Sequence, residues 1–338
     1  MVFFFKSIFK FKKITLLIII LICVIQINYW YKKTINKQIN SNEVTIEIPP
    51  GAGSATIISL LKEKKLLYSS FLYKTEFFFR RSKYIPKAGE YLIPANSSIS
   101  DIFDILNSGK VIQHRITFPE CFSSYEIVKK INNEKNLQGL SIVNLPEEGS
   151  LLPETYFYFK GYSKEKLLLR MQLAMQNSLS KAWKNRQDDL PIDNKNDALI
   201  LASMVESEAG SAAEKKLIAS VFMNRIKNKM KFQSDPTVIY GFEKMNKTKI
   251  KKLIKKHLKI DHSWNTYTRN GLPKTPICNP GVDTIEATLN PYKTNYYYFV
   301  SDGMGGHLFS KTYSEHKNNI SHVKNFLKKR IYSDNNKL

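Results

Sequence analysis

Residues 197–241, DALILASMVESEAGSAAEKKLIASVFMNRIKNKMKFQSDPTVIYG, decide the fold of this chain. The run 198–205 is almost entirely apolar, which predicts a helix that is buried on most sides. Two carboxylates, Glu206 and Glu208, follow this run, and Gly210 is a residue type that commonly ends helices. We therefore predict a buried helix that ends in an acidic pair.

A carboxylate in the last turn of a buried helix faces the negative end of the helix dipole and is partly desolvated. Both effects raise its pKa, and a carboxyl with a raised pKa can serve as a general acid at neutral pH. Glu206 and Glu208 lie roughly 200° apart around a helix, so at most one of them faces a cleft. Solvated surface carboxylates are the alternative interpretation.

A second helix is predicted after the acidic pair. Ser211 and Glu214 have the S-x-x-E spacing of a capping box, which would begin a helix running through Lys229. Residues 233–241 are a polar turn followed by a short apolar run. Their amide, hydroxyl, carboxylate and aromatic groups suit sugar recognition; the candidates are Gln233, Ser234, Asp235, Thr237 and Tyr240.

Residues 261–280 are predicted to form a long loop, because Gly and Pro recur throughout them. Long loops are often functional, and this one offers hydrogen-bonding groups and an aromatic face for stacking on a sugar ring: Asn265, Thr266, Tyr267 and Thr268. The pattern also predicts a helix over 164–184, a buried strand over 296–300 and an amphipathic helix over 314–329. His307, after the glycine turn 302–306, is either a substrate contact or a structural residue.

The N-terminal 31 residues predict a membrane anchor. Four lysines (Lys6, Lys10, Lys12 and Lys13) precede the apolar run 14–25, and three aromatic residues follow at 29–31. With its flanks this segment approaches the ~20 residues that span a bilayer. The lysines place the N-terminus in the cytoplasm and the body outside. A cleaved signal peptide is the alternative, but no A-x-A-like site follows.

Residues 43–134 repeat one pattern of strand, proline, serine-containing turn and helix. The strands are predicted at 44–50, 91–94 and 114–119, each followed by helical spacing of apolar residues. A small α+β module follows from this repetition.

The net charge of +23 favours an anionic partner, but the lysines are dispersed and no nucleic-acid-binding signature is present. We expect no nucleic-acid partner. Cys23 lies in the apolar span, which leaves Cys121 and Cys278 as a pair that could form a disulfide. The cysteines and the scattered histidines have no zinc-site spacing, so we expect no metal and no cofactor.

Several motifs together resemble the YceG-like family of MltG-type, membrane-anchored endolytic murein transglycosylases. They are VESEAG, LIASVFMNRI and FQSDPTVIYG in the stretch quoted first, EGSLLPETY at 148–156, NTYTRNGLPKTPICNPG at 265–281 and YYFVSDGMGGHLFS at 297–310. The resemblance implies an α+β chain with three parts: a cytoplasmic N-terminus and transmembrane helix (1–33), a LysM-like α+β module (34–145) and a mixed α/β catalytic domain (146–338).

The resemblance also implies an activity. Glu208 would protonate the glycosidic oxygen between N-acetylmuramic acid and N-acetylglucosamine, then act as base on the 6-hydroxyl so that a 1,6-anhydro end forms. Glu206 is the alternative acid; Glu206 and Asp235 would otherwise stabilise charge. The sugar contacts would be Gln233, Ser234, Thr237, Tyr240, Asn265, Thr266 and Tyr267, with Glu154 at the cleft edge.

The implied partners are peptidoglycan glycan strands, the inner membrane through the N-terminal helix, and peptidoglycan synthases. The catalytic body would be periplasmic. Two alternatives stay open: a hydrolytic muramidase that uses a second carboxylate such as Asp235 or Asp283, and a non-catalytic peptidoglycan-binding or division scaffold.

Overall fold

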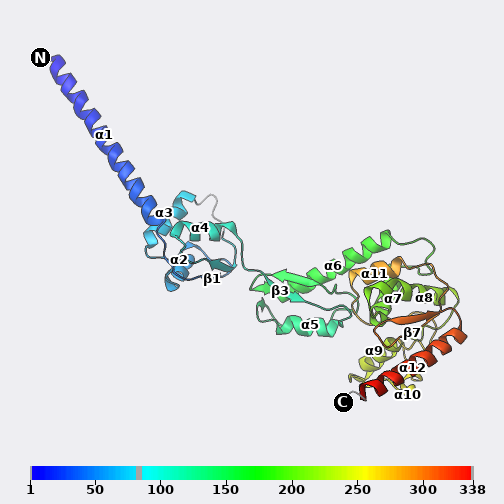
Figure 1. Cartoon of the computed structure of the whole chain (residues 1–338). Helices are drawn as coiled ribbons and strands as arrows, with labels where there is room; N and C mark the ends of the chain where they lie inside the picture. The colour runs from blue at the N-terminus through cyan, green and yellow to red at the C-terminus, as the bar shows by residue number, and fades with distance from the viewer. Residues whose placement is uncertain (1, 81–85, 336–338) are drawn as a thin grey trace. The chain divides into compact units, whose positions relative to one another are not determined.

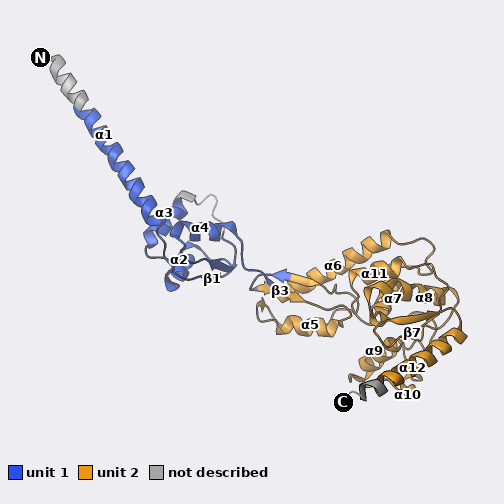
Figure 2. Cartoon of the chain, viewed as in Figure 1, with its two compact units in different colours: residues 1–114, 157–161 blue, residues 115–156, 162–338 orange. Residues whose placement is uncertain are grey.

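The computed structural model describes residues 2–80 and 86–335, with side chains over 12–78 and 86–330. The chain divides into two compact units, each described here by itself (Figure 2). Unit 1 comprises Met1–His114 and Phe157–Gly161, and unit 2 comprises Arg115–Tyr156 and Tyr162–Leu338. The predicted boundary between 145 and 146 therefore falls inside unit 2.

The chain begins with one long helix, α1 (Val2–Ile35) (Figure 1). The segment Lys12–Ile35 contains an 18-residue stretch with a mean hydropathy of 2.1. No residue of that stretch is buried in the protein. Among the described residues, this is the one helix long and apolar enough to cross a membrane. Lys6 and Lys10, on which the predicted orientation partly depends, lie outside the residues whose side chains are described.

Unit 1 continues after α1 as a small α+β body. Its elements are β1 (Val44–Ile48), α2 (Ser54–Glu63), α3 (Ser70–Arg80), β2 (Gly89–Ile93) and α4 (Ile99–Ser108). The two strands are antiparallel, with Val44 opposite Ile93 and Ile48 opposite Gly89. Alternate residues of both strands are buried, as a half-buried sheet requires, and they pack with the apolar faces of α2 and α4. The first two predicted strand–helix copies are confirmed.

The chain from residue 114 to 184 contains β3 (His114–Thr117), α5 (Ser124–Asn133), β4 (Leu137–Gln138), β5 (Thr155–Tyr158), β6 (Tyr162–Ser163) and α6 (Lys164–Lys184). β3 pairs with β5, and β4 pairs in parallel with β6. The predicted third copy is present as β3 followed by α5, and Ser123 caps α5 in a capping box with Glu126. The helix predicted at 164–184 is α6.

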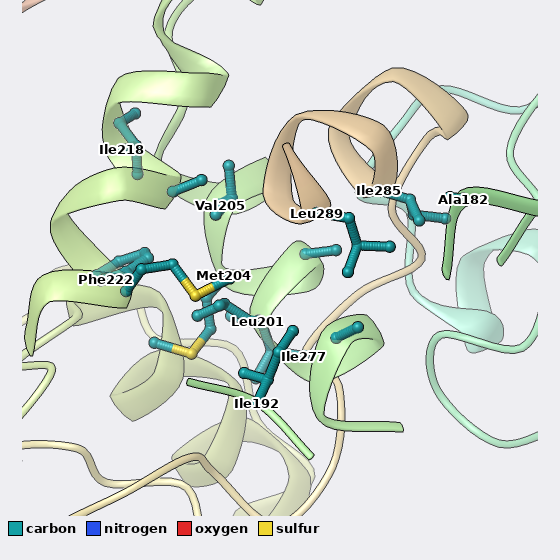
Figure 3. Packing of buried hydrophobic residues seen from close by; sticks show 14 of the residues in the cluster. Ala182, Ile192, Leu201, Met204, Val205, Ile218, Phe222, Ile277, Ile285 and Leu289 are labelled. Carbon is teal, nitrogen blue, oxygen red and sulfur yellow. The ribbon is translucent and has the colours of Figure 1, made fainter. Parts of the chain in front are cut away.

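The remainder of unit 2 is built around the buried helix α7 (Lys195–Glu208). It contains α8 (Lys215–Lys227), α9 (Asp235–Asn246), α10 (Lys255–Leu258), α11 (Val282–Leu289), β7 (Tyr298–Ser301), β8 (His307–Ser310) and α12 (Tyr313–Asn335). Leu201 and Val205 of α7 share one apolar cluster with Phe222 of α8 and with Ile285 and Leu289 of α11 (Figure 3). The mixed helix and strand content of the predicted fold class is confirmed.

Two predictions for unit 2 are corrected, and a third segment is defined further. The Ser211–Glu214 capping box is wrong: the Ser211 side chain caps nothing, α8 begins at Lys215, and it ends at Lys227 instead of Lys229. The strand predicted at 296–300 begins at residue 298 and is only half-buried, because β7 pairs with β8 alone in a two-stranded sheet. The apolar run after the polar turn at 233–235 is helical, and Pro236 lies in the first turn of α9, where its missing N–H costs little.

A disulfide joins two distant segments of unit 2. Cys121 and Cys278 are bonded, with their Cα atoms 4.8 Å apart at a sequence separation of 157 residues. The pairing that the sequence left open is therefore present. Asn279 reinforces this junction, because its main-chain oxygen accepts a hydrogen bond of 2.9 Å from the Cys121 N–H.

Candidate active site

Helix α7 delivers Glu208 to the site as its last residue. The helix begins at Asn194, whose side chain accepts a hydrogen bond of 2.9 Å from the Asp197 N–H. It ends because Ala209 has an extended backbone (φ −72°, ψ 121°). A Cβ atom on Gly210 would lie 2.2 Å from the main-chain oxygen of Gly305, so only glycine permits this approach.

The environment of Glu208 favours its protonated form. The side chain is half-buried, and its Oε1 accepts a hydrogen bond of 2.6 Å from the Ser234 hydroxyl. Burial raises the pKa of Glu208 above its usual range, and the Asp235 carboxylate raises it further. The Ser234 hydrogen bond and the electrostatic influence of His307 and Arg225 lower the pKa, but the net direction is upward. A partly exposed carboxyl whose pKa is raised is better suited to general-acid chemistry than a fully solvated one.

Glu206 occupies a different environment from Glu208, as their spacing on the helix predicts. Its side chain is 5% exposed, and its Oε1 lies 3.1 Å from the Lys215 ammonium. Its Oε2 accepts hydrogen bonds from the Gly281 N–H (2.8 Å) and the Thr284 hydroxyl (2.5 Å). All three partners belong to the surrounding fold, so Glu206 has the contacts of a structural residue that joins α7, α8 and α11.

Three of the predicted sugar contacts form a buried hydroxyl network under Glu208. Ser234, Thr237 and Thr266 are each at most 2% exposed. The Ser234 N–H donates to the Thr266 hydroxyl (3.0 Å), and the Thr237 hydroxyl donates to the Ser234 carbonyl (2.6 Å). The two threonine hydroxyls are 2.9 Å apart. This network orients the serine that contacts Glu208 and leaves these threonines little surface for a ligand.

Gln233, Asp235 and Tyr267 are the predicted contacts on either side of Ser234 and in the facing loop that keep accessible surface. Gln233 is exposed and has a positive φ of 49°, and its N–H donates to the Thr266 carbonyl (3.2 Å). Asp235 is also exposed, and its Oδ1 accepts a 2.6 Å hydrogen bond from the Tyr267 hydroxyl. Burial and this contact raise the pKa of Tyr267, so its hydroxyl stays protonated.

Asn265 organises the loop instead of facing outward. It is 1% exposed, its amide donates to the carbonyls of Leu258 (3.1 Å) and Ile260 (2.7 Å), and its side-chain oxygen accepts from the Tyr267 N–H (2.8 Å). The loop predicted at 261–280 is irregular throughout, as expected. Asn265 thereby sets the position of Tyr267.

Tyr240 lies in a separate aromatic and charged cluster on α9. Its ring packs edge-on against Trp264 (5.8 Å between centroids), and Lys244 donates to its hydroxyl (2.9 Å). Its own hydroxyl points to Glu148, at 3.5 Å. Burial raises the pKa of Glu148. Glu154 is exposed, and no contact joins its carboxylate to Glu208 in the described part of the chain.

Sequence reasoning missed Arg225 and the Glu214–His307 pair as neighbours of Glu208. Arg225 is 7% exposed, and its guanidinium donates to the carbonyls of Tyr297 (2.7 Å) and Phe232. In the sequence it is one basic residue of a helix, and no local pattern indicates that it is buried. Glu214 was assigned to a cap, whereas its carboxylate contacts His307.

Within the described ranges, no group of three or more His, Cys, Asp or Glu side chains could hold a metal ion. The predicted absence of a metal stays a prediction. A surface depression of about 440 Å³ lies along α5, lined by Phe122, Glu126, Lys129, Lys130, Asn133 and Glu134. It contains none of the residues around Glu208.

Comparison with known proteins assigns the chain to a family. The model of the YceG-like family matches residues 46–322, and the chain belongs to this family. It is similar to the endolytic murein transglycosylase of Bacillus subtilis strain 168, with 28% identity over 303 residues that cover 81% of this chain and 82% of that protein.

A protein of the same name from Streptococcus pneumoniae strain D39 is 24% identical over 323 residues, which cover 82% of this chain and 58% of the pneumococcal protein. Among solved structures, a yceG-like protein of Listeria monocytogenes at 2.6 Å has a TM-score of 0.50 and 27% identity. That match covers 82% of this chain and 99% of the Listeria chain.

Proposed function

We propose that this chain is an endolytic peptidoglycan transglycosylase of the lyase type, with Glu208 as its acid and base. The observation that carries the proposal is the half-buried Glu208 carboxyl, whose pKa is raised at the exposed end of a buried helix. Membership of the YceG-like family and the names of the two relatives support the same activity.

In the first step Glu208 donates its proton to the glycosidic oxygen between N-acetylmuramic acid and N-acetylglucosamine. The bond from C1 of the muramic residue to that oxygen breaks, and its electron pair leaves with the N-acetylglucosamine oxygen. Positive charge then develops at C1 and its ring oxygen. The Asp235 carboxylate, exposed beside the site, can stabilise that charge.

In the second step the Glu208 carboxylate takes the proton of the 6-hydroxyl of the same muramic residue. The 6-oxygen forms a bond to C1, which yields the 1,6-anhydro end and restores the protonated glutamic acid. No water is consumed. Because the nucleophile belongs to the substrate, one carboxyl group serves both steps, unlike the pair that most glycosidases need.

The surrounding residues divide into two roles in this proposal. Asp235 and Tyr267, which act electrostatically with Glu208, and the exposed Gln233 would contact the sugar. Ser234 positions the Glu208 carboxyl, and Glu206 connects α7 to Lys215. Thr237, Thr266 and Asn265 would act through the loop geometry, while Tyr240 and Glu154 would contact more distant parts of a glycan strand.

We further propose that α1 anchors the chain in the inner membrane, with the N-terminus cytoplasmic and the body periplasmic. The apolar window in Lys12–Ile35 supports an anchor, and the Cys121–Cys278 disulfide supports an oxidising compartment. In the same proposal, residues 34–145 are a LysM-like module that binds the wall, residues 146–338 are the catalytic domain, and peptidoglycan synthases are partners. The strand–helix repetition supports the module assignment.

The test is digestion of purified sacculi by the full-length chain in detergent micelles, with mass spectrometry of the released ends. We expect 1,6-anhydro ends from the wild type and at least a 100-fold lower rate from Glu208→Gln, since general acid–base catalysis contributes about 10²–10⁴-fold. Glu165→Gln is the matched control, because Glu165 is exposed on α6. It should cut at the wild-type rate.

Two other results would overturn the proposal in different ways. Products with reducing ends and no anhydro ends would identify a hydrolase, and loss of activity in Asp235→Asn or Asp283→Asn would then name its second carboxylate. Binding to sacculi without any released product would identify a wall-binding scaffold.

A further inference from the structure

Glu214 and His307 form a tightly packed pair that the proposed chemistry does not yet use. The Glu214 Oε1 accepts a hydrogen bond of 2.7 Å from the His307 main-chain N–H, and its Oε2 lies 3.0 Å from the His307 Nδ1. The two side chains are only 14% and 12% exposed. They are 93 residues apart in sequence, so this contact is a product of the tertiary fold.

The carboxylate of Glu214 determines which ring nitrogen of His307 carries a proton. An ionised carboxylate only accepts hydrogen bonds, so Nδ1 is the donor in this contact. Nε2 has no hydrogen-bond partner among the described residues. The Phe299 ring packs edge-on against the imidazole, with 5.3 Å between centroids and 89° between planes, and limits its rotation. The imidazole is therefore oriented with Nε2 available.

The pair is packed against the chain segment that follows Glu208. A Cβ on Gly210 would lie 2.2 Å from the Gly305 carbonyl oxygen and 3.8 Å from the Glu214 Oε2. A Cβ on Gly306 would lie 3.2 Å from the Glu214 Oε1. The glycine turn and the Glu214 carboxylate thus meet the backbone two residues after the proposed acid, and they bring His307 to the end of α7.

We propose that the Glu214–His307 pair is a positioning device that holds an imidazole beside Glu208 and stabilises the Glu208 carboxylate formed when its proton reaches the glycosidic oxygen. This inference rests on the proposed function and assigns a role to two residues outside the acid itself. Without such stabilisation, proton donation from a desolvated carboxyl creates a charge with few partners.

The groups that face Glu208 come from three elements and one loop. Asp235 at the start of α9 raises the pKa of Glu208, whereas Arg225 of α8 and His307 of β8 lower it. The Tyr267 hydroxyl, from the loop, donates its hydrogen bond to Asp235 and is itself uncharged. His307 and Arg225 lower the pKa of Glu208 together, and His307 is the one of these two that a carboxylate, Glu214, holds in place.

The experiment compares His307→Asn with the wild type, using the full-length chain in detergent and solubilised peptidoglycan strands as substrate. Asparagine places an amide N–H near the position of Nδ1 and can retain the contact with Glu214, but it has no titratable ring. His257→Asn is the matched control. His257 lies in α10, where its ring packs on Phe242 of α9, and it contacts none of the groups around Glu208. The rate of anhydro-end formation is measured as a function of pH for each protein.

We expect kcat of His307→Asn to fall about 10- to 100-fold with KM little changed, since the lost interaction belongs to the charged form of Glu208. Because His307 lowers the pKa of Glu208, its replacement raises that pKa, so the acid stays protonated to higher pH and the alkaline limb of the kcat profile moves upward. Glu214→Gln should give the same direction of change, and histidine ¹⁵N spectra should show that the Nδ1–H tautomer is lost.

A uniform loss of rate at every pH, with an unshifted alkaline limb, would mean that the pair only supports the fold, and it would overturn the inference. A wild-type rate in His307→Asn would also overturn it. Failure of the proposed function is recognisable separately: the wild type would then release no anhydro ends at all, before any variant is compared.

Discussion

Ser234 donates a hydrogen bond of 2.6 Å to Glu208 and thereby joins the residue before α9 to the last residue of α7. Ser234 is itself 2% exposed and donates its N–H to the Thr266 hydroxyl at 3.0 Å. The position of the Glu208 carboxyl therefore depends on a loop 26 residues downstream as well as on its own helix.

Ser234→Ala removes a donor that favours ionised Glu208. We expect the pKa of Glu208 to rise, the alkaline limb of activity to move to higher pH, and kcat to fall about 10- to 100-fold, because a hydrogen bond to a charged group contributes about 1.5–3 kcal/mol. Ser207→Ala is the control, since that hydroxyl donates to the Met204 carbonyl of its own helix. Equal effects in the two variants would contradict the assigned role.

Glu206 and Glu208 should differ in their effects on stability. Glu206→Gln leaves the buried Lys215 with only the half-exposed Glu120, at 3.0 Å, as its carboxylate partner. We expect a loss of about 3 kcal/mol in the free energy of unfolding, the usual cost of breaking a buried ion pair. Chemical denaturation at neutral pH measures it. A loss below that of a surface variant such as Glu165→Gln would refute the structural role of Glu206.

The contribution of Glu208 to stability depends on pH. Its folded-state pKa lies above the unfolded value of 4.5, so the folded protein binds more protons in this range and is destabilised as pH rises from about 4.5 through the raised pKa. Glu208→Gln has no such group. We expect this variant to be more stable than the wild type at neutral pH and to lose this part of the pH dependence, as measured by denaturation at several pH values.

Gly210 is required by the close approach of Gly305. Gly210→Ala places a Cβ 2.2 Å from the Gly305 oxygen, so either the glycine turn or the end of α7 must move. We expect a loss of about 1–3 kcal/mol in stability and reduced activity. Gly53→Ala is the control, because a Cβ there meets nothing within 4 Å and its φ is −81°. If both variants have the melting temperature of the wild type, the close approach of Gly210 and Gly305 does not contribute to stability.

The local structure of the site was predictable from short-range patterns. The apolar run 198–205 and Gly210 correctly indicate a buried helix that ends at Glu208. The two-residue spacing of Glu206 and Glu208 correctly indicates that they face different surroundings. These features depend on residues within one helix, where geometry follows directly from the sequence.

The remaining contacts depend on residues far apart in the chain. Glu214 has the spacing of a capping residue, but His307 provides two donors from a strand 93 residues away, and these compete with the local cap. Thr237 and Thr266 have polar side chains typical of a binding surface, yet they satisfy each other and are buried. Polar residues alone do not reveal whether their partner is a ligand or another part of the protein.

Synthesis from the N-terminus determines when the bond between Cys121 and Cys278 can form. A chain that emerges from the ribosome N-terminus first exposes Cys121 long before its partner, and every residue of α7 is translated between the two. Oxidation must therefore wait until most of unit 2 has been made, and the Cys121 thiol stays without this partner during that interval.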